Sequence, residues 1–305
     1  ESMLPHSTFL RFPDEEKNRI IALPAYLGDG FSVAGVKWIS SFLGNLERGI
    51  ERASAVVILN STETGRPQAI IEGSAISARR TAASGALAAR VLHSDATGLG
   101  LIGCGPINFE VARFVLAALP GVESFLVFDK DENKARQFKD KCLELSDKVE
   151  VGLAPDAETV LRNCPLTSLA TTAISPHLND LSQSPPQSTI LHISLRDFAP
   201  EVILSCDNVV DDIDHVCRAQ TSAHLAEQLT GGRDFIRCTL GDILLDRAPA
   251  RDSRPGTTIF SPFGLGILDL AVAHFLYEQA MEKGLGTVVE SFFPETWTNR
   301  TNDRR

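Results

Sequence analysis

Charged side chains that could take part in chemistry occur at three places in otherwise apolar surroundings. Lys37 lies within an apolar stretch, Arg79 and Arg80 open an alanine-rich stretch, and Asp197 follows an apolar run. A carboxyl group can act as a general acid or base, and a guanidinium group can bind a carboxylate through two parallel hydrogen bonds. A cation in apolar surroundings costs free energy unless an anion meets it, so we expect these cations to bind an anionic substrate.

A glycine-rich segment, residues 97–108, predicts a binding site for a dinucleotide. An apolar run leads into Gly103 and Gly105, a helical pattern follows, and a second apolar run ends in Asp129. This order is typical of a Rossmann unit, in which a pyrophosphate lies at the helix N-terminus. Asp129 is placed to bind the ribose hydroxyls and to repel a 2′-phosphate, which favours NAD over NADP. The third glycine position holds Asn108, so a glycine turn of another α/β protein is the alternative.

The elements that must position these residues change in character along the chain. Up to about residue 95, β-branched segments and a turn predict antiparallel strands, followed by a helix over 77–92. From residue 98 strands and helices alternate, which is typical of a doubly wound parallel sheet. The expected strands of that sheet are 99–103, 124–128, 149–152, 167–171, 189–194 and 208–211.

We therefore predict an α/β protein in three parts. A mixed or antiparallel β-rich domain spans residues 1–95, a Rossmann domain spans 96–262, and the C-terminal part, 263–305, contains a helix that returns to the first domain. The β-rich segment up to residue 72 has more apolar strand faces than one helix can cover, and exposed sheet edges favour pairing. We therefore expect a homodimer built through the first domain.

The composition limits the class of protein. The 305 residues are 43% apolar, which is enough for one large domain or two smaller ones. The formal net charge is −10 and no basic run precedes Arg304 and Arg305, so nucleic acid is not an expected partner. No apolar run reaches the roughly 18 residues of a transmembrane helix, and the first residues lack the layout of a signal peptide.

The cysteines and histidines point to no metal or disulfide site. The six cysteines form no CxxC pair, and the seven histidines show no spacing typical of metal ligands. Unpaired cysteines in apolar runs are typical of reduced thiols in the cytoplasm. We expect a cytoplasmic protein that is not associated with a membrane and holds no metal.

The pattern of Lys37 in a Gly-Val-Lys strand, Arg80-Thr81 at a helix start, the glycine loop and the Asp197 loop resembles the ornithine cyclodeaminase/μ-crystallin family. The resemblance covers nearly the whole chain. It implies a substrate-binding and dimerisation domain joined to an NAD-binding Rossmann domain. It also implies that Arg80, rather than Arg79, binds the substrate and that Arg11 binds a substrate carboxylate. Family members carry a further helix and strand ahead of the segment that matches residue 1.

Four segments, 4–13, 20–28, 37–42 and 194–201, resemble the branch of that family that makes L-2,3-diaminopropionate. That branch oxidatively cleaves N-(2-amino-2-carboxyethyl)-L-glutamate and releases 2-oxoglutarate as the second product. The resemblance implies that Asp197 and Lys37 are catalytic and that Arg11, Lys37 and Arg80 hold the carboxylates of this amino-acid conjugate. The residues expected to hold NAD are Thr81, Gly103, Gly105, Pro106, Ile107, Asp129, Thr171 and Ile193.

Other interpretations stay open. The chain could be an ornithine or lysine cyclodeaminase or an amino-acid dehydrogenase of the same family, or a non-enzymatic ligand-binding protein like the crystallin members. Cyclodeaminases carry a lysine where this chain has Glu201, and a different turn where it has residues 261–264. Structural roles are also possible, because Lys37 could extend its amine from a strand edge and Asp197 could cap a turn.

Overall fold

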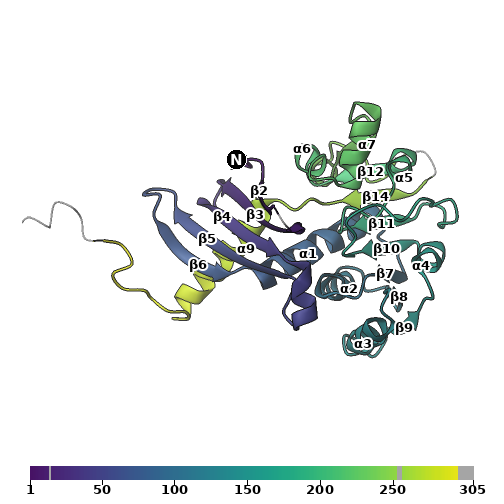
Figure 1. Ribbon diagram of the computed structural model, residues 1–305, viewed down its shortest axis with the longest axis horizontal. Coiled ribbons are helices and arrows are strands. Elements are labelled where there is room, and N and C mark those ends of the chain that lie inside the picture. Colours follow the sequence, from purple (N-terminus) through teal and green to yellow (C-terminus); the bar gives the residue numbers. More distant parts are fainter. Residues whose placement is uncertain (14, 253–255, 295–305) are drawn as a thin grey trace, which may run out of the picture.

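The computed structural model describes residues 1–13, 15–252 and 256–294. Two domains lie side by side and are joined by a long helix, α1 (Ser74–Leu92) (Figure 1). The C-terminal part predicted over 263–305 is described up to residue 294. No helix within the described ranges is long and apolar enough to cross a membrane.

The first domain is an antiparallel sheet, as predicted. Its strands run in the order β1-β3-β4-β5-β6, and β2 also pairs with β3. The strands are β1 (Ser2–Met3), β2 (Thr8–Phe12), β3 (Glu15–Leu27), β4 (Val33–Ser41), β5 (Ala53–Ser61) and β6 (Pro67–Glu72), with a 3-10 helix, η1 (Leu43–Arg48), after β4. Side chains alternate between the two faces of such a sheet. One face buries Val57 and Leu59 against Leu270 of helix α9 (Gly266–Glu282).

The second domain is a doubly wound Rossmann domain, which confirms the predicted fold class. Its eight parallel strands have the order β13-β12-β14-β11-β10-β7-β8-β9. They are β7 (Gly98–Ile102), β8 (Ser124–Phe128), β9 (Glu150–Leu153), β10 (Leu166–Leu169), β11 (Thr189–His192), β12 (Asp207–Val210), β13 (Ile236–Thr239) and β14 (Thr258–Ser261). The sequence did not predict β13 and β14, although it did predict four other strands of the same four-residue length, β9, β10, β11 and β12.

Helices cover both faces of this sheet. One face packs against α1, α2 (Pro106–Ala118), α3 (Glu132–Leu143) and α8 (Leu240–Leu244). The other packs against α4 (Ala157–Asn163), α5 (Pro200–Ser205) and α7 (Ser222–Thr230), while α6 (Ile213–Val216) follows β12. From β7 the chain continues through β8 to β9 at one edge of the sheet. From β10 it continues in the opposite direction, toward β13 at the other edge. Ligands of open α/β sheets bind where the strand order reverses, which here is between β7 and β10.

Helices α1 and α9 connect the two domains. Ile76, near the start of α1, lies in the core of the first domain, whereas Ala82 and Leu92 of the same helix lie in the Rossmann core. Helix α9 packs on β3, β4 and β5 of the first sheet. Helix α1 begins at Ser74, one turn earlier than the sequence predicted from Ser77. A rigid connection of this kind fixes the position of charged residues from both domains relative to one another.

Candidate active site

The glycine turn after β7 leaves room for a ligand at the N-terminus of α2. Gly103 has φ +93°, and a Cβ there would lie 2.5 Å from the carbonyl oxygen of Ala170, so this position requires glycine. A Cβ on Gly105 would meet nothing within 4 Å. Gly105 is the N-cap of α2 and Pro106 is its first residue. The backbone is thus open toward solvent at the point where a pyrophosphate binds in this fold.

Asn108, which replaces the third glycine of the motif, holds this turn in place. Its amide nitrogen donates to the carbonyl oxygens of Ile102 and Gly103, each at 2.8 Å, and its oxygen accepts from the Ser168 hydroxyl at 2.7 Å. Asn108 is fully buried. Its three hydrogen bonds connect the turn after β7 to strand β10, so the departure from the glycine motif has a structural role that the sequence did not reveal.

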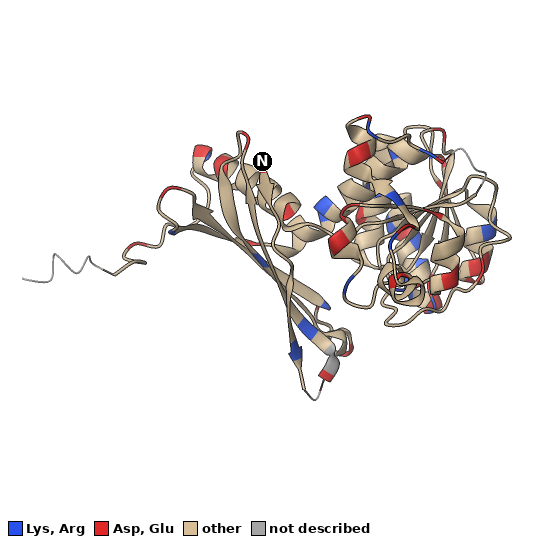
Figure 2. Ribbon diagram, turned by 90° about the horizontal axis from the view of Figure 1, so that it is seen from above, with Lys and Arg blue, Asp and Glu red and all other residues tan. Residues whose placement is uncertain are grey.

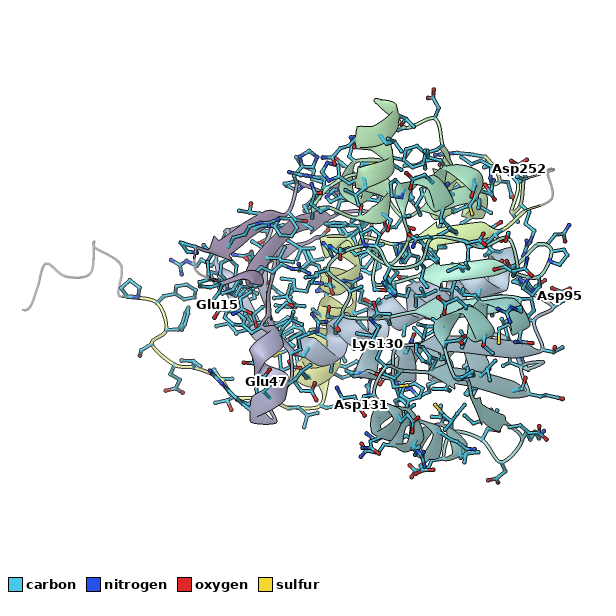
Figure 3. All side chains as sticks on the ribbon, turned by 45° about the vertical axis from the view of Figure 1, so that its right-hand side comes forward. Glu15, Glu47, Asp95, Lys130, Asp131 and Asp252 are labelled. Carbon is cyan, nitrogen blue, oxygen red and sulfur yellow. The ribbon has the colours of Figure 1, made fainter. Side chains whose placement is uncertain are left out.

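Asp129 lies at the end of β8, next to the glycine turn. One carboxylate oxygen accepts from the backbone N–H of Cys104 at 2.8 Å, and the other accepts from that of Asp131 at 3.0 Å. Lys130 and Asp131 lie on the side of the Rossmann domain that faces the first domain, and Asp95, which precedes β7, lies on the opposite side (Figure 3). The carboxyl ends of the strands therefore face the first domain.

Asp197 follows β11 and is completely buried. The hydroxyls of Thr171 and Ser194 donate to its two oxygens, and His192 Nε2 lies 3.1 Å from Oδ2. Burial opposes ionisation, but the hydrogen bonds with His192, Ser194 and Thr171 outweigh it and lower the pKa of Asp197 to about 2. Asp197 is therefore ionised at neutral pH, and its two oxygens accept hydrogen bonds from two hydroxyl groups.

Lys37 and Arg80 share one buried carboxylate, that of Asp269 in α9. Lys37 Nζ lies 2.6 Å from Asp269 Oδ2, and Arg80 Nε lies 2.8 Å from Oδ1. The exposed fractions of the three side chains are 2% for Lys37, 10% for Arg80 and 0% for Asp269. We call these residues the buried triad. The substrate was the expected partner of both cations, and this expectation is incomplete, because the chain itself supplies one anion.

The buried triad gives Lys37 an unusual acidity. Burial lowers the pKa of Lys37 to about 7, helped by the charge of Arg80 and opposed by Asp269. An amine with a pKa near neutrality can accept and donate protons under the conditions in which most enzymes work. Its Nζ also lies 3.3 Å from the Ser77 hydroxyl at the start of α1.

Of the two arginines at the start of α1, Arg80 points inward and Arg79 outward. The side chain of Arg79 is 58% exposed and lies 3.7 Å from Glu110. The Nη atoms of Arg80 form no hydrogen bond with the described residues. They lie beside Gly264, where a Cβ would come within 2.6 Å of Nη1. The outer edge of this guanidinium is therefore available to a second carboxylate.

Arg11, Arg19, Arg52 and Arg196 form a second group of cations, which we call the arginine cluster. Arg11 and Arg19 are directly opposite each other on β2 and β3, and Arg19 is opposite Ser41 on β4. Arg52 Nη1 donates to the Ser41 hydroxyl at 2.7 Å. Arg196 reaches the cluster from the Asp197 loop, and its Nη2 donates to the carbonyl of Ala219 at 2.8 Å.

The arginine cluster has no counter-ion among the described side chains. None of its four members forms an ion pair there, and Arg19 Nε is buried without a hydrogen-bond partner. Burial, together with the charges of Arg196, Arg52 and Arg11, lowers the pKa of Arg19 to about 10. The sequence suggested only Arg11. Alternation along β3 places Arg19 on the same face as the buried Leu23, and this was the available signal.

The other expected cofactor residues are distributed over helices α1 and α2 and the segments that follow β10 and β11. Thr81 bonds within helix α1, donating to the carbonyl of Ser77 at 2.7 Å. Ile193 directly follows β11, and its side chain packs against Gly85 of α1. Thr171 is bound to Asp197, and Ile107 lies in the first turn of α2. Glu201 is exposed in the first turn of α5.

Comparisons with known proteins identify the family to which the chain is similar. Residues 4–284 match the profile of the ornithine cyclodeaminase/mu-crystallin family. The chain is 29% identical over 280 residues to N-((2S)-2-amino-2-carboxyethyl)-L-glutamate dehydrogenase of Staphylococcus aureus, covering 90% of this chain and 83% of the relative.

Two solved structures have the same fold. The Δ(1)-pyrroline-2-carboxylate reductase of Thermococcus litoralis, in complex with NADH and L-proline, has a TM-score of 0.85 and 25% identity, covering 94% of this chain and 90% of that one. An archaeal alanine dehydrogenase dimer with bound NAD has a TM-score of 0.84 and 27% identity, covering 95% of this chain and 89% of that one.

Proposed function

Because the chain belongs to the ornithine cyclodeaminase/mu-crystallin family, we propose that it is an NAD-dependent oxidoreductase acting on a carbon–nitrogen bond. We propose as substrate N-(2-amino-2-carboxyethyl)-L-glutamate, which is cleaved to 2-oxoglutarate and L-2,3-diaminopropionate. The observation that carries this choice is the surplus of cationic side chains in the site, because the substrate has three carboxylates. The similarity to the staphylococcal dehydrogenase supports it.

The described residues fit a bound dinucleotide. The open backbone at Gly105, Pro106 and Ile107 would hold the pyrophosphate, and Asp129 is near enough to the turn to bind the adenosine ribose. Thr81, Thr171 and Ile193 would line the nicotinamide half. When bound, NAD supplies an acceptor for the hydride from the glutamate Cα.

The residues of the site would handle the protons of the reaction. Loss of the hydride gives a carbon–nitrogen double bond, water adds to its carbon, and the carbinolamine breaks into a ketone and an amine. Lys37, with its pKa near 7, would take the proton from the water. The carboxylate of Asp197 would stabilise positive charge on the nitrogen and exchange its proton through the hydroxyls of Thr171 and Ser194.

A second copy of the chain would cover the open face of the first sheet. The face opposite α9 carries Trp38, which is 42% exposed, and Ile70, which is 62% exposed. Pro24, Tyr26 and Val36 line a groove on the same face. We propose a homodimer through this face, in keeping with the dimeric archaeal alanine dehydrogenase. A single-chain mass by light scattering at micromolar concentration would rule it out.

The test of the reaction is to incubate the protein with NAD and the proposed conjugate and to follow NADH absorbance and 2-oxoglutarate. We expect equal amounts of the two products. Asp197→Asn should lower the rate about 100- to 10,000-fold while NAD still binds, whereas Glu201→Gln, on the exposed turn of α5, should not. Turnover of L-ornithine without net NADH would identify a cyclodeaminase instead, and NAD binding without turnover of any amino acid would identify a binding protein.

A further inference from the structure

The arginine cluster is built in a way that disfavours the empty protein. Like charges placed directly opposite each other on neighbouring antiparallel strands repel, and Arg11 and Arg19 are such a pair. Arg52 and Arg196 add two more positive charges, and Arg19 Nε is buried without a partner. A buried donor without a partner costs free energy, as does an unpaired charge. An anionic ligand would remove all of these costs together.

The position of the cluster relates it to the candidate active site. Lys37 and Ser41 lie on the same face of β4, four residues apart, which is about 13 Å along a strand. Arg19 and Arg52 adjoin Ser41, so the cluster lies at one end of this face and the buried triad at the other. Arg196 precedes Asp197 in the chain, and the charge of Asp197 opposes the lowering of the pKa of Arg196 by burial. The cluster therefore also borders the Asp197 loop. Lys and Arg segments are visible at the end of the first sheet (Figure 2).

We propose that Arg19, Arg52 and Arg196, with Arg11, form a subsite for the glutamate half of the substrate, and this rests on the proposed function. The two halves of the conjugate differ in charge. The glutamate half carries two carboxylates and no primary ammonium group. The diaminopropionate half carries one carboxylate and a primary ammonium group, which four guanidinium groups would repel. The subsite therefore selects the end that is released as 2-oxoglutarate, and it disfavours small amino acids that have one carboxylate.

The test uses 2-oxoglutarate as a probe, because its binding requires no turnover. We expect calorimetry on the NAD-loaded protein to detect 2-oxoglutarate and glutarate, and to detect L-2,3-diaminopropionate at least tenfold more weakly. Arg19→Gln and Arg52→Gln should each weaken 2-oxoglutarate binding about 10- to 100-fold, since hydrogen bonds to charged groups contribute about 1.5–3 kcal/mol. The exposed Arg48→Gln, in η1, is the matched control.

Two further measurements separate a binding role from a structural one. Arg19→Gln should unfold at the same or a higher temperature than the wild type without ligand, because repulsion is relieved, and Arg19→Lys should restore part of the affinity. Unchanged 2-oxoglutarate binding in Arg19→Gln and Arg52→Gln, or equal binding of both products, would overturn the subsite even if the conjugate is oxidised. Binding of 2-oxoglutarate through Arg19 without oxidation of the conjugate would uphold the subsite and reject the proposed reaction.

Discussion

The buried triad and the arginine cluster lie at opposite ends of the same sheet face. They differ in whether the chain itself supplies an anion to pair with the positive charges. In the triad, Asp269 sits between Lys37 and Arg80, so the net charge of this almost fully buried group is +1 when Lys37 is protonated and zero when it is not. The cluster gathers four cations with no carboxylate bonded to them among the described residues. The triad thus contains an anion of its own, whereas the cluster has none among the described side chains.

Because of this difference, we expect substitutions in the two regions to have different effects on folding and on ligand binding. A buried ion pair is costly to break, because removing one partner leaves the other charge unpaired in a poorly hydrated place. Changes to the triad should therefore affect folding and chemistry together. Changes to the cluster should affect ligand affinity and leave folding intact or improved. The overall net charge of −10 makes the cluster more distinctive, since the rest of the chain repels the anions that it attracts.

The largest effect is expected from removing the carboxylate of Asp269. Asp269→Asn leaves Lys37 and Arg80 buried without an anion, so the free energy of unfolding should fall by about 3–5 kcal/mol. Urea unfolding followed by circular dichroism measures this change. Glu282→Gln, exposed at the end of the same helix, should shift the free energy by less than about 0.5 kcal/mol.

Equal stabilities of Asp269→Asn and Glu282→Gln would contradict the description of Asp269 as the buried anion that stabilises Lys37 and Arg80. It would show that the two cations find other partners or are hydrated when Asp269 is lost, and the distinction between the two regions would disappear.

A change at Arg80 should lower both affinity and stability. Arg80 is paired with the buried Asp269, so Arg80→Ala should lower the free energy of unfolding by about 1.5–3 kcal/mol. Its free Nη edge would hold a substrate carboxylate, so KM should rise about tenfold or more. Arg80→Lys should restore little, since an ammonium group cannot bind Asp269 and a substrate carboxylate in the same plane.

The neighbouring Arg79→Ala is the matched control for this prediction, because Arg79 lies on the same helix turn but is 58% exposed. Stability and KM within about twofold of the wild type are expected there. If Arg80→Ala changed stability and KM as little as Arg79→Ala does, Arg80 would contribute to neither folding nor substrate binding, despite its burial.

Much of the fold could be predicted from the sequence because its signals are local. The glycine turn, Asp129 and the alternating strands and helices follow one another within a few dozen residues, and the antiparallel strands of the first domain show their β-branched pattern. The partner of Lys37 could not be found in this way, since Asp269 is 232 positions away and only the packing of α9 brings them together. Arg19 and Arg52 have the same limitation. Strand register places Arg19 opposite Arg11 and Ser41, and only the packing of the two domains brings Arg196 near them.

The acidity of Lys37 predicts a pH dependence of rate and of stability. With a pKa of about 7, Lys37 becomes a base as pH rises through 7, so kcat should rise there and Lys37→Arg should lose this inflection along with activity. The unfolded chain keeps this proton up to about pH 10.5, so it binds more protons than the native state between pH 7 and 10.5. The contribution of Lys37 to stability therefore rises with pH in that window. A pH profile of kcat without an inflection near 7 would remove Lys37 as the base.

The smallest effect, and the one most specific to the arginine cluster, is a response to salt. Raising NaCl from about 0.01 M to 1 M shortens the screening length from about 30 Å to 3 Å, which weakens repulsion between partly exposed charges. The wild type should therefore gain up to about 1 kcal/mol of stability relative to Arg19→Gln, in which one repelling charge is absent.

The exposed Arg48→Gln makes this small difference measurable. Each variant changes the formal net charge from −10 to −11, so effects of the whole-molecule charge cancel between Arg19→Gln and Arg48→Gln. The Arg48 variant should follow the wild type across the salt range, as measured by urea unfolding at each NaCl concentration. If the free energies of unfolding of the two variants depend on salt in the same way, the four arginines do not repel one another in solution. An anion would then not be required to stabilise the cluster.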